Sequence, residues 1–143
     1  MGNRDTKMTT GQIIEIFSRI ADLLEIKGEV IYKILAYRKA VDSLENLSGD
    51  LREIWQDAKL TEIPGVGKAI AEKIDEMLTT GKLGYLEELE QEVPPSLIEV
   101  LRVTDVGPKK AALFWKQAGI TNLKDLELAA KSGNLRSLPG MGE

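Results

Sequence analysis

The chain has 143 residues, which is enough for one domain of ordinary size or two small ones. It contains neither cysteine nor histidine, which excludes zinc sites, disulfides, thiol chemistry and histidine-based acid/base catalysis. The net charge of −4 argues mildly against a nucleic-acid partner. However, residues 33–39 and 109–116 carry basic side chains and no acid, and a phosphate backbone responds to such local patches. No apolar run approaches the ~20 residues that span a bilayer, so no membrane partner is expected.

Helical periodicity dominates the chain from Thr10 onward. The first predicted helix has apolar residues on one face, namely Ile13, Phe17, Ile20 and Leu24. Gly28 ends this helix. The second, at 29–47, has an apolar stripe of its own, formed by Val30, Ile34, Tyr37, Val41 and Leu44. Asp50 is placed to cap a third helix at 51–58.

The rest of the chain continues in short helices separated by glycine and proline. They are predicted at 68–80, 84–92, 95–103, 109–118 and 122–131. Gly81 and Gly119 end two of them. The acidic helix at 84–92, together with Pro94 and Pro95, marks the boundary between two subdomains. No segment alternates with the period of two that is typical of strands, so the predicted fold class is all-α.

Two segments of the chain repeat one another around a tight turn. They are residues 60–71, with the turn Pro-Gly-Val-Gly at 64–67, and residues 100–111, with Asp-Val-Gly-Pro at 105–108. In each segment an apolar residue is followed by any two residues, a second apolar residue and any one residue. Gly or Asp, then Val and Gly come next, and an Ala follows after three more residues. A third copy begins at 135 and reaches Glu143 where its second helix should start.

The repeated turn has a specific physical use. Glycine lets two helices join this closely, and the central valine fills the gap between them. The second helix then offers free backbone N–H groups and the positive end of its dipole, which bind a phosphate without reading a base. The residues expected to hold phosphates are Gly65, Val66, Gly67, Lys68, Val106, Gly107, Lys109 and Lys110. A plain αα-hairpin is the alternative, which the repetition of the turn makes the weaker one.

These residues resemble the helix-hairpin-helix motif of DNA repair proteins. The resemblance extends to the family X (polymerase beta-like) DNA polymerases of the bacterial and archaeal type, over nearly the whole chain from about residue 12. Residues 36–40, 63–67, 70–76 and 80–83 resemble the N-terminal lyase domain of that family, and 103–108 with Ala111 resemble its adjoining DNA-binding subdomain. The expected domains are a disordered stretch at 1–9, a lyase-like DNA-binding domain at 10–84 and a second hairpin subdomain at 85–143.

The resemblance also implies a chemistry for the first domain. The lyase nucleophile of the family is the lysine of an Ala-Glu-Lys-Ile run, which is Lys73 here. Its amine forms a Schiff base with C1′ of a 5′-deoxyribose phosphate, and β-elimination follows. Lys33 and Tyr37 are implied to lie near the 5′-phosphate, with Glu72 beside the nucleophile. For Tyr37 the alternative is plain core packing.

Two positions depart from the family pattern. Ala69 and Tyr85 stand where the family has phosphate-binding lysines, so the pocket is less positive than the pattern implies. The alternative for Lys73 is a solvated helix lysine that pairs with Glu76 three residues later.

The resemblance further implies a monovalent cation, Na⁺ or K⁺, held by backbone carbonyls of the hairpins. The carbonyls belong to Thr61, Ile63, Val66, Leu101, Val103 and Val106. Asp105 replaces the glycine that the motif prefers, and its charge weakens phosphate binding at the second hairpin. The acidic cluster of Glu87, Glu88, Glu90 and Glu92 is interpreted as a solvated helix face. No Asp-x-Asp pair is present, so Mg²⁺ is expected only in a polymerase palm beyond this chain.

We therefore expect the N-terminal piece of a cytoplasmic, nucleoid-associated family X repair polymerase. It is expected to be a monomer that binds gapped, nicked or abasic-site DNA and acts as a lyase without a cofactor. Two other classes stay open: a non-catalytic DNA-binding module with an inert Lys73, and a protein–protein scaffold of helical hairpins. Because the third hairpin lacks its second helix, we expect the tail after Ser132 to be poorly ordered and the natural protein to continue.

Overall fold

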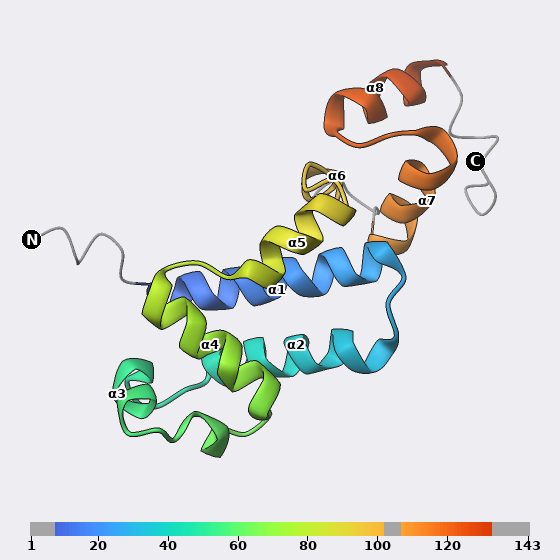
Figure 1. Ribbon diagram of the computed structural model, residues 1–143. Coiled ribbons are helices and arrows are strands. Elements are labelled where there is room, and N and C mark those ends of the chain that lie inside the picture. The colour runs from blue at the N-terminus through green and yellow to red at the C-terminus, as the bar shows by residue number, and fades with distance from the viewer. Residues whose placement is uncertain (1–7, 102–106, 133–143) are drawn as a thin grey trace, which may run out of the picture. The chain divides into compact units, whose positions relative to one another are not determined.

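The computed structural model describes residues 8–101 and 107–132, and within them every regular element is a helix (Figure 1). The all-α prediction is therefore confirmed. The elements are α1 (Thr10–Lys27), α2 (Ile31–Glu45), α3 (Leu51–Gln56), the 3₁₀ turn η2 (Leu60–Glu62), α4 (Lys68–Thr80), α5 (Gly84–Glu92), α6 (Leu97–Val100), α7 (Pro108–Ala118) and α8 (Leu123–Ser132). No helix in the described part of the chain is long and apolar enough to cross a membrane.

Helix ends follow the predicted signals most closely where glycine sets them. α4 and α5 have the predicted bounds, and Gly81 closes α4 in the left-handed conformation with φ of +82°. Gly119 ends α7 in the same way, with φ of +68°. Asp50 accepts a hydrogen bond from the Arg52 N–H at 3.0 Å and so caps α3 as predicted. α6 is shorter than the predicted helix at 95–103, of which residues 102 and 103 lie outside the described part of the chain.

The chain divides into two compact units. One comprises Met1–Ala21 and Val30–Glu88, and the other comprises Asp22–Glu29 and Leu89–Glu143. The division along the later part of the chain falls within α5. The second unit also includes the end of α1, so this helix supplies residues to both units.

The core of the first unit forms between the first part of α1, α2 and α4. Ile13, Phe17 and Ile20 of the α1 stripe are fully buried, and the rings of Phe17 and Tyr37 lie 5.5 Å apart. Val30, which we placed on the α2 stripe, is instead 56% exposed. The prediction was wrong there because Val30 precedes the helix as its extended N-cap residue, so the helical spacing of side chains does not extend to it.

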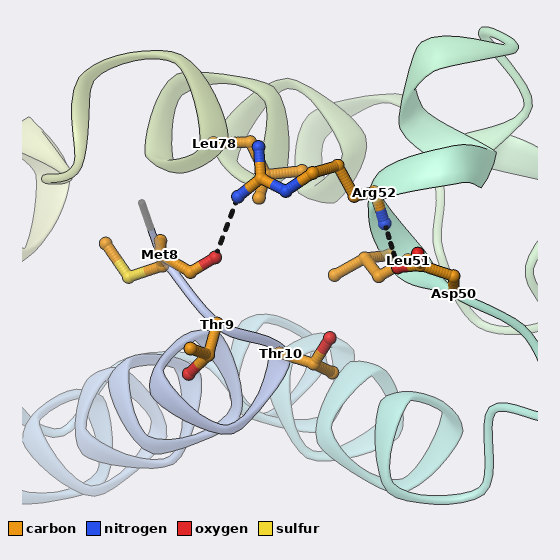
Figure 2. Close-up of a pocket in the computed structure, with 7 residues that line it drawn as sticks. All are labelled: Met8, Thr9, Thr10, Asp50, Leu51, Arg52 and Leu78. Carbon is orange, nitrogen blue, oxygen red and sulfur yellow. Dashed lines mark hydrogen bonds between the residues drawn. The ribbon is translucent and has the colours of Figure 1, made fainter. Parts of the chain in front are cut away.

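The start of α1 is held by a local cap and by a side chain from α3 (Figure 2). Thr9 and Gln12 exchange side-chain to backbone hydrogen bonds of 2.8 and 3.0 Å, which is a capping box. The Arg52 guanidinium donates to the Met8 carbonyl at 3.1 Å beside a cavity of about 240 Å³. Met8 is buried, so the disorder expected for 1–9 does not hold at Met8 and Thr9, while residues 1–7 lie outside the described residues.

The second unit has its own apolar core, formed by α6, α7, α8 and their neighbours. The largest fully buried side chains there include Leu97, Phe114 and Ile120. The Ser96 hydroxyl donates to the Thr121 carbonyl and joins the segment before α6 to the segment before α8. α7, which follows the second repeated turn, is packed against this core through Ala111 and Phe114.

Candidate functional site

The first repeated turn joins η2 to α4, and its central valine is buried as predicted. Val66 is only 3% exposed, and Ile63 is buried beside it. The Val66 N–H donates to the Ile63 carbonyl at 3.0 Å, which closes the turn. The apolar positions of the repeat therefore hold the turn against the core, and its glycines and lysine stay at the surface.

Gly65 is required by the fold itself. Its φ is +81°, a conformation that residues with a Cβ rarely adopt. A Cβ at this position would lie 3.1 Å from the Ser43 hydroxyl oxygen and 3.5 Å from the Lys39 Cβ, both on α2. The Ser43 hydroxyl also donates to the Pro64 carbonyl, so the turn is attached directly to α2.

Gly67 and Gly107 differ from Gly65, because nothing in the fold requires glycine at either position. Each is the N-cap of its helix, with φ and ψ of −87° and −174° at Gly67 and −98° and −176° at Gly107. These are extended conformations that any residue adopts. A Cβ on either glycine would meet no atom within 4 Å. Both helix starts are therefore open to a close approach from outside.

The two repeats match in their hydrogen bonds as well. The Ala71 N–H donates to the Gly67 carbonyl at 2.9 Å, and the Ala111 N–H donates to the Gly107 carbonyl at 3.0 Å. The alanine that recurs in the sequence repeat thus makes the first intrahelical bond of each second helix. Val106 and Asp105 lie outside the described residues.

Three of the lysines predicted to hold phosphates lie exposed at these helix starts. Lys68 begins α4, and Lys109 and Lys110 follow Pro108 in the first turn of α7. Neither first turn contains an acidic residue. Positive side chains here add to the positive end of the helix dipole, an arrangement that an anion stabilises.

A surface cavity of about 340 Å³ adjoins Lys68 on the first unit. Trp55 of α3, Thr61 of η2, and Glu72 and Asp75 of α4 are among the residues that line it. The Trp55 indole N–H donates to the Asp75 carboxylate at 2.7 Å, which fixes the ring against α4. This contact had no local signal in the sequence, because it joins residues of two helices that are 20 positions apart.

The structure brings two of the predicted site residues together through a third. The Lys73 ammonium lies 4.9 Å from the centre of the Tyr85 ring. Tyr85 is stacked on Tyr37, with ring centres 6.2 Å apart and planes 11° from parallel. Lys73 itself is half-buried. Glu76, which we considered as its partner, instead accepts a hydrogen bond from the Gly84 N–H at 2.9 Å.

Tyr37 is a core residue as well as a neighbour of the site. It is 6% exposed, because Phe17 covers it from α1 and Tyr85 stacks on it from α5. Burial raises the pKa of the Tyr37 phenol above its ordinary value, and the nearby Tyr85 raises it further. Lys33 is exposed one helical turn earlier on α2.

The backbone carbonyls named for a monovalent cation are described at the first hairpin only. Thr61, Ile63 and Val66 lie around the closed turn, and the Ile63 carbonyl already accepts one hydrogen bond from Val66. A carbonyl has two lone pairs, so Ile63 keeps an acceptor position for a hard cation. At the second hairpin, Val103 and Val106 lie outside the described residues and Leu101 lies at the end of α6.

Family models match both parts of the chain. Residues 8–83 match the model of a helix-hairpin-helix domain. Residues 97–143 match the model of a SAM-like helix-hairpin-helix tandem. The first match contains α4 and the turn before it, and the second contains the turn before α7.

Curated proteins match nearly the whole chain. It is 32% identical over 131 residues to the DNA polymerase/3′-5′ exonuclease PolX of Bacillus subtilis (strain 168), covering 92% of this chain and 22% of that protein. It is 32% identical over 116 residues to DNA polymerase lambda of Arabidopsis thaliana, covering 80% and 21%. For DNA polymerase lambda of Rattus norvegicus the identity is 29% over 114 residues, covering 80% and 19%. The chain thus spans about a fifth of the length of these relatives.

Proposed function

This chain belongs to the helix-hairpin-helix family and is related to the family X DNA polymerases, and on that premise we propose that it binds DNA through the sugar–phosphate backbone. Each of its two described helix starts offers free backbone N–H groups and lysine side chains to a phosphate. Phosphate contacts fix position and carry no sequence information. The proposed binding is therefore independent of sequence.

The observation that carries this proposal is the open space at Gly67 and Gly107. Neither the backbone angles nor the neighbouring atoms require glycine there, yet both repeats have it. A glycine of this kind is explained by the close approach of another molecule to the main chain. A phosphate that accepts hydrogen bonds from the first N–H groups of α4 and α7 meets this requirement.

Binding to DNA is tested by its dependence on salt and on DNA structure. We expect nearly equal affinity for unrelated sequences, with a log–log salt slope on the order of −2 to −4, since each hairpin neutralises few phosphates. Gapped or nicked DNA with a 5′-phosphate is expected to bind more tightly than intact duplex, because Lys33, Lys68 and Lys73 offer positive charge to that end. Strong sequence preference or no salt dependence would refute the proposal.

We further propose that Lys73 gives the chain 5′-deoxyribose-phosphate lyase activity in base excision repair, in the bacterial cytoplasm. The Lys73 amine attacks C1′ of the opened sugar and water leaves, which forms a Schiff base. Removal of a C2′ proton then breaks the bond between C3′ and its oxygen, and the downstream strand leaves with a 5′-phosphate. Half-burial of Lys73 beside the Tyr85 ring supports this role, since the site excludes part of the solvent.

Borohydride trapping on incised abasic-site DNA tests the lyase proposal. We expect the wild-type chain to become covalently attached and Lys73→Ala to lose nearly all attachment. Lys68→Ala is the matched control on the same helix, and it should weaken binding while keeping attachment at saturating DNA. Full attachment by Lys73→Ala would remove the role from Lys73. DNA binding by a wild-type chain that is never trapped would favour a non-catalytic DNA-binding module.

A cation at the first hairpin is part of the same proposal. Na⁺ or K⁺ held by the carbonyls of Thr61, Ile63 and Val66 would offer a positive charge to a DNA phosphate at the turn. Exchange of K⁺ for the bulky tetramethylammonium ion at constant ionic strength is expected to weaken DNA binding. Equal affinity in both salts would refute the cation site.

A further inference from the structure

Tyr85 links the buried aromatic side chains of the first unit to Lys73, the proposed nucleophile. Phe17 contacts Tyr37, Tyr37 stacks on Tyr85, and the Tyr85 ring lies 4.9 Å from the Lys73 ammonium. An ammonium within about 6 Å of a ring centre is attracted by the negative face of the ring. Phe17 is fully buried, so the core of the first unit fixes this row of aromatic rings at its buried end.

A second contact between α4 and α5 holds Tyr85 in place. The Glu76 carboxylate accepts a hydrogen bond at 2.9 Å from the N–H of Gly84, the residue just before Tyr85. Glu76 and Lys73 are three residues apart on α4, so they share one face of the helix. The Thr80 hydroxyl and the left-handed Gly81 tighten the connection between the two helices. The start of α5 is thus joined to α4 by hydrogen bonds just before Tyr85 in the chain.

From these contacts we infer that Tyr85 is a positioning residue for Lys73. The inference rests on the lyase function proposed above. A lysine side chain has four rotatable bonds, and ordering it for attack costs conformational entropy. Tyr85 removes part of this cost before DNA binds, because its ring, itself stacked on Tyr37, holds the end of the Lys73 side chain in place. The ring acts through its face and not through its hydroxyl, so phenylalanine would replace it.

The contact itself is measured without any lyase substrate. In the free protein with ¹³C-labelled lysine, the ring current of Tyr85 should move the Lys73 ε-methylene protons upfield, and Lys73→Arg identifies their signal. Tyr85→Phe should keep the shift, while Tyr85→Leu should lose it. If thermal unfolding shows that Tyr85→Leu is poorly folded, Tyr85→Met serves in its place, since its unbranched side chain keeps an apolar contact with Tyr37. A wild-type shift that is absent, or that persists in the aliphatic variants, would overturn the inference.

The consequence for the reaction is measured by the rate of borohydride trapping at saturating DNA. We expect Tyr85→Phe to stay close to the wild-type rate, and the aliphatic variant to be slower by about two- to fivefold, which is the size of an exposed cation–π contact. An aliphatic variant that loses the ring-current shift but is trapped at the wild-type rate would overturn the positioning role. A wild type that shows the shift but is never trapped would refute the lyase proposal and the positioning role with it, while the contact stands.

Discussion

Gly65 and Ser43 lie so close that a Cβ on the glycine would be 3.1 Å from the serine hydroxyl oxygen. The serine belongs to α2 and the glycine to the turn before α4, so the hairpin is built directly on a core helix. Two residues later, Gly67 has no such neighbour. The two glycines of one turn therefore serve different purposes, and substitutions separate them.

Gly65→Ala is expected to destabilise the protein. The left-handed backbone and the contact with Ser43 both oppose a Cβ, at a combined cost of about 1–3 kcal/mol. Urea unfolding followed by circular dichroism measures this loss as a lower midpoint at constant slope. Unchanged stability would show that the turn does not have the described geometry.

Gly67→Ala is expected to leave the free energy of unfolding within about 0.5 kcal/mol of wild type, since a Cβ there meets nothing and the angles suit alanine. It should weaken DNA binding, because the added methyl group lies where a phosphate approaches the main chain. Fluorescence anisotropy with a labelled duplex measures the affinity. Equal affinity of Gly67→Ala and wild type would contradict the role given to the open helix start.

Removal of both lysines at the start of α7 is expected to reduce the electrostatic part of DNA binding. The double variant Lys109→Ala/Lys110→Ala should lower affinity for all sequences alike and reduce the steepness of the salt slope by about 1–2. Lys124→Ala/Lys131→Ala removes two lysines from α8 as a control of equal charge. The same loss in both double variants would mean that only net charge matters and that α7 has no special role.

Tyr37 is expected to make stability depend on pH in the alkaline range. Its pKa is raised in the folded protein above the ordinary value of 10.0, mainly by burial. Above pH 10 the unfolded chain therefore releases this proton while the folded protein keeps it, so stability falls as pH rises. The stabilising contribution is fully present below pH 10, and the loss is at most about 1.4 kcal/mol per pH unit.

The variant Tyr37→Phe isolates this contribution from the other tyrosines and the lysines. The difference in unfolding free energy between wild type and variant should be constant from pH 7 to 9 and should shift in favour of the variant above pH 10. Urea titrations at each pH supply the values. A difference that stays constant through pH 11 would contradict the burial of the Tyr37 hydroxyl.

Local signals in the sequence predicted most of the fold. Glycines that adopt positive φ ended α4 and α7 where they were predicted to, and the side chain of Asp50 caps α3. These features depend on residues only a few positions apart. The prediction for Val30 was wrong because periodicity alone does not say where the first helical turn begins.

The candidate site was harder to predict, because its contacts join different helices. Lys73 and Tyr37 were named from a resemblance, but the residue that links them was noted only as a departure from the family pattern. Spacing along one helix suggested Glu76 as the partner of Lys73. The Glu76 carboxylate is occupied by the Gly84 N–H, a contact that depends on how the connection after Gly81 folds back.

Because α1 supplies residues to both compact units, the two halves of this chain are not interchangeable modules. Leu23, Leu24 and Ile26 are fully buried and belong to the second unit, although along the chain they lie between the two segments of the first unit. A recombination event that exchanged only the part after α5 would leave these three side chains facing a core they did not evolve with. Compensating changes in α1 would then be needed, so the second unit is exchanged intact only together with the end of α1.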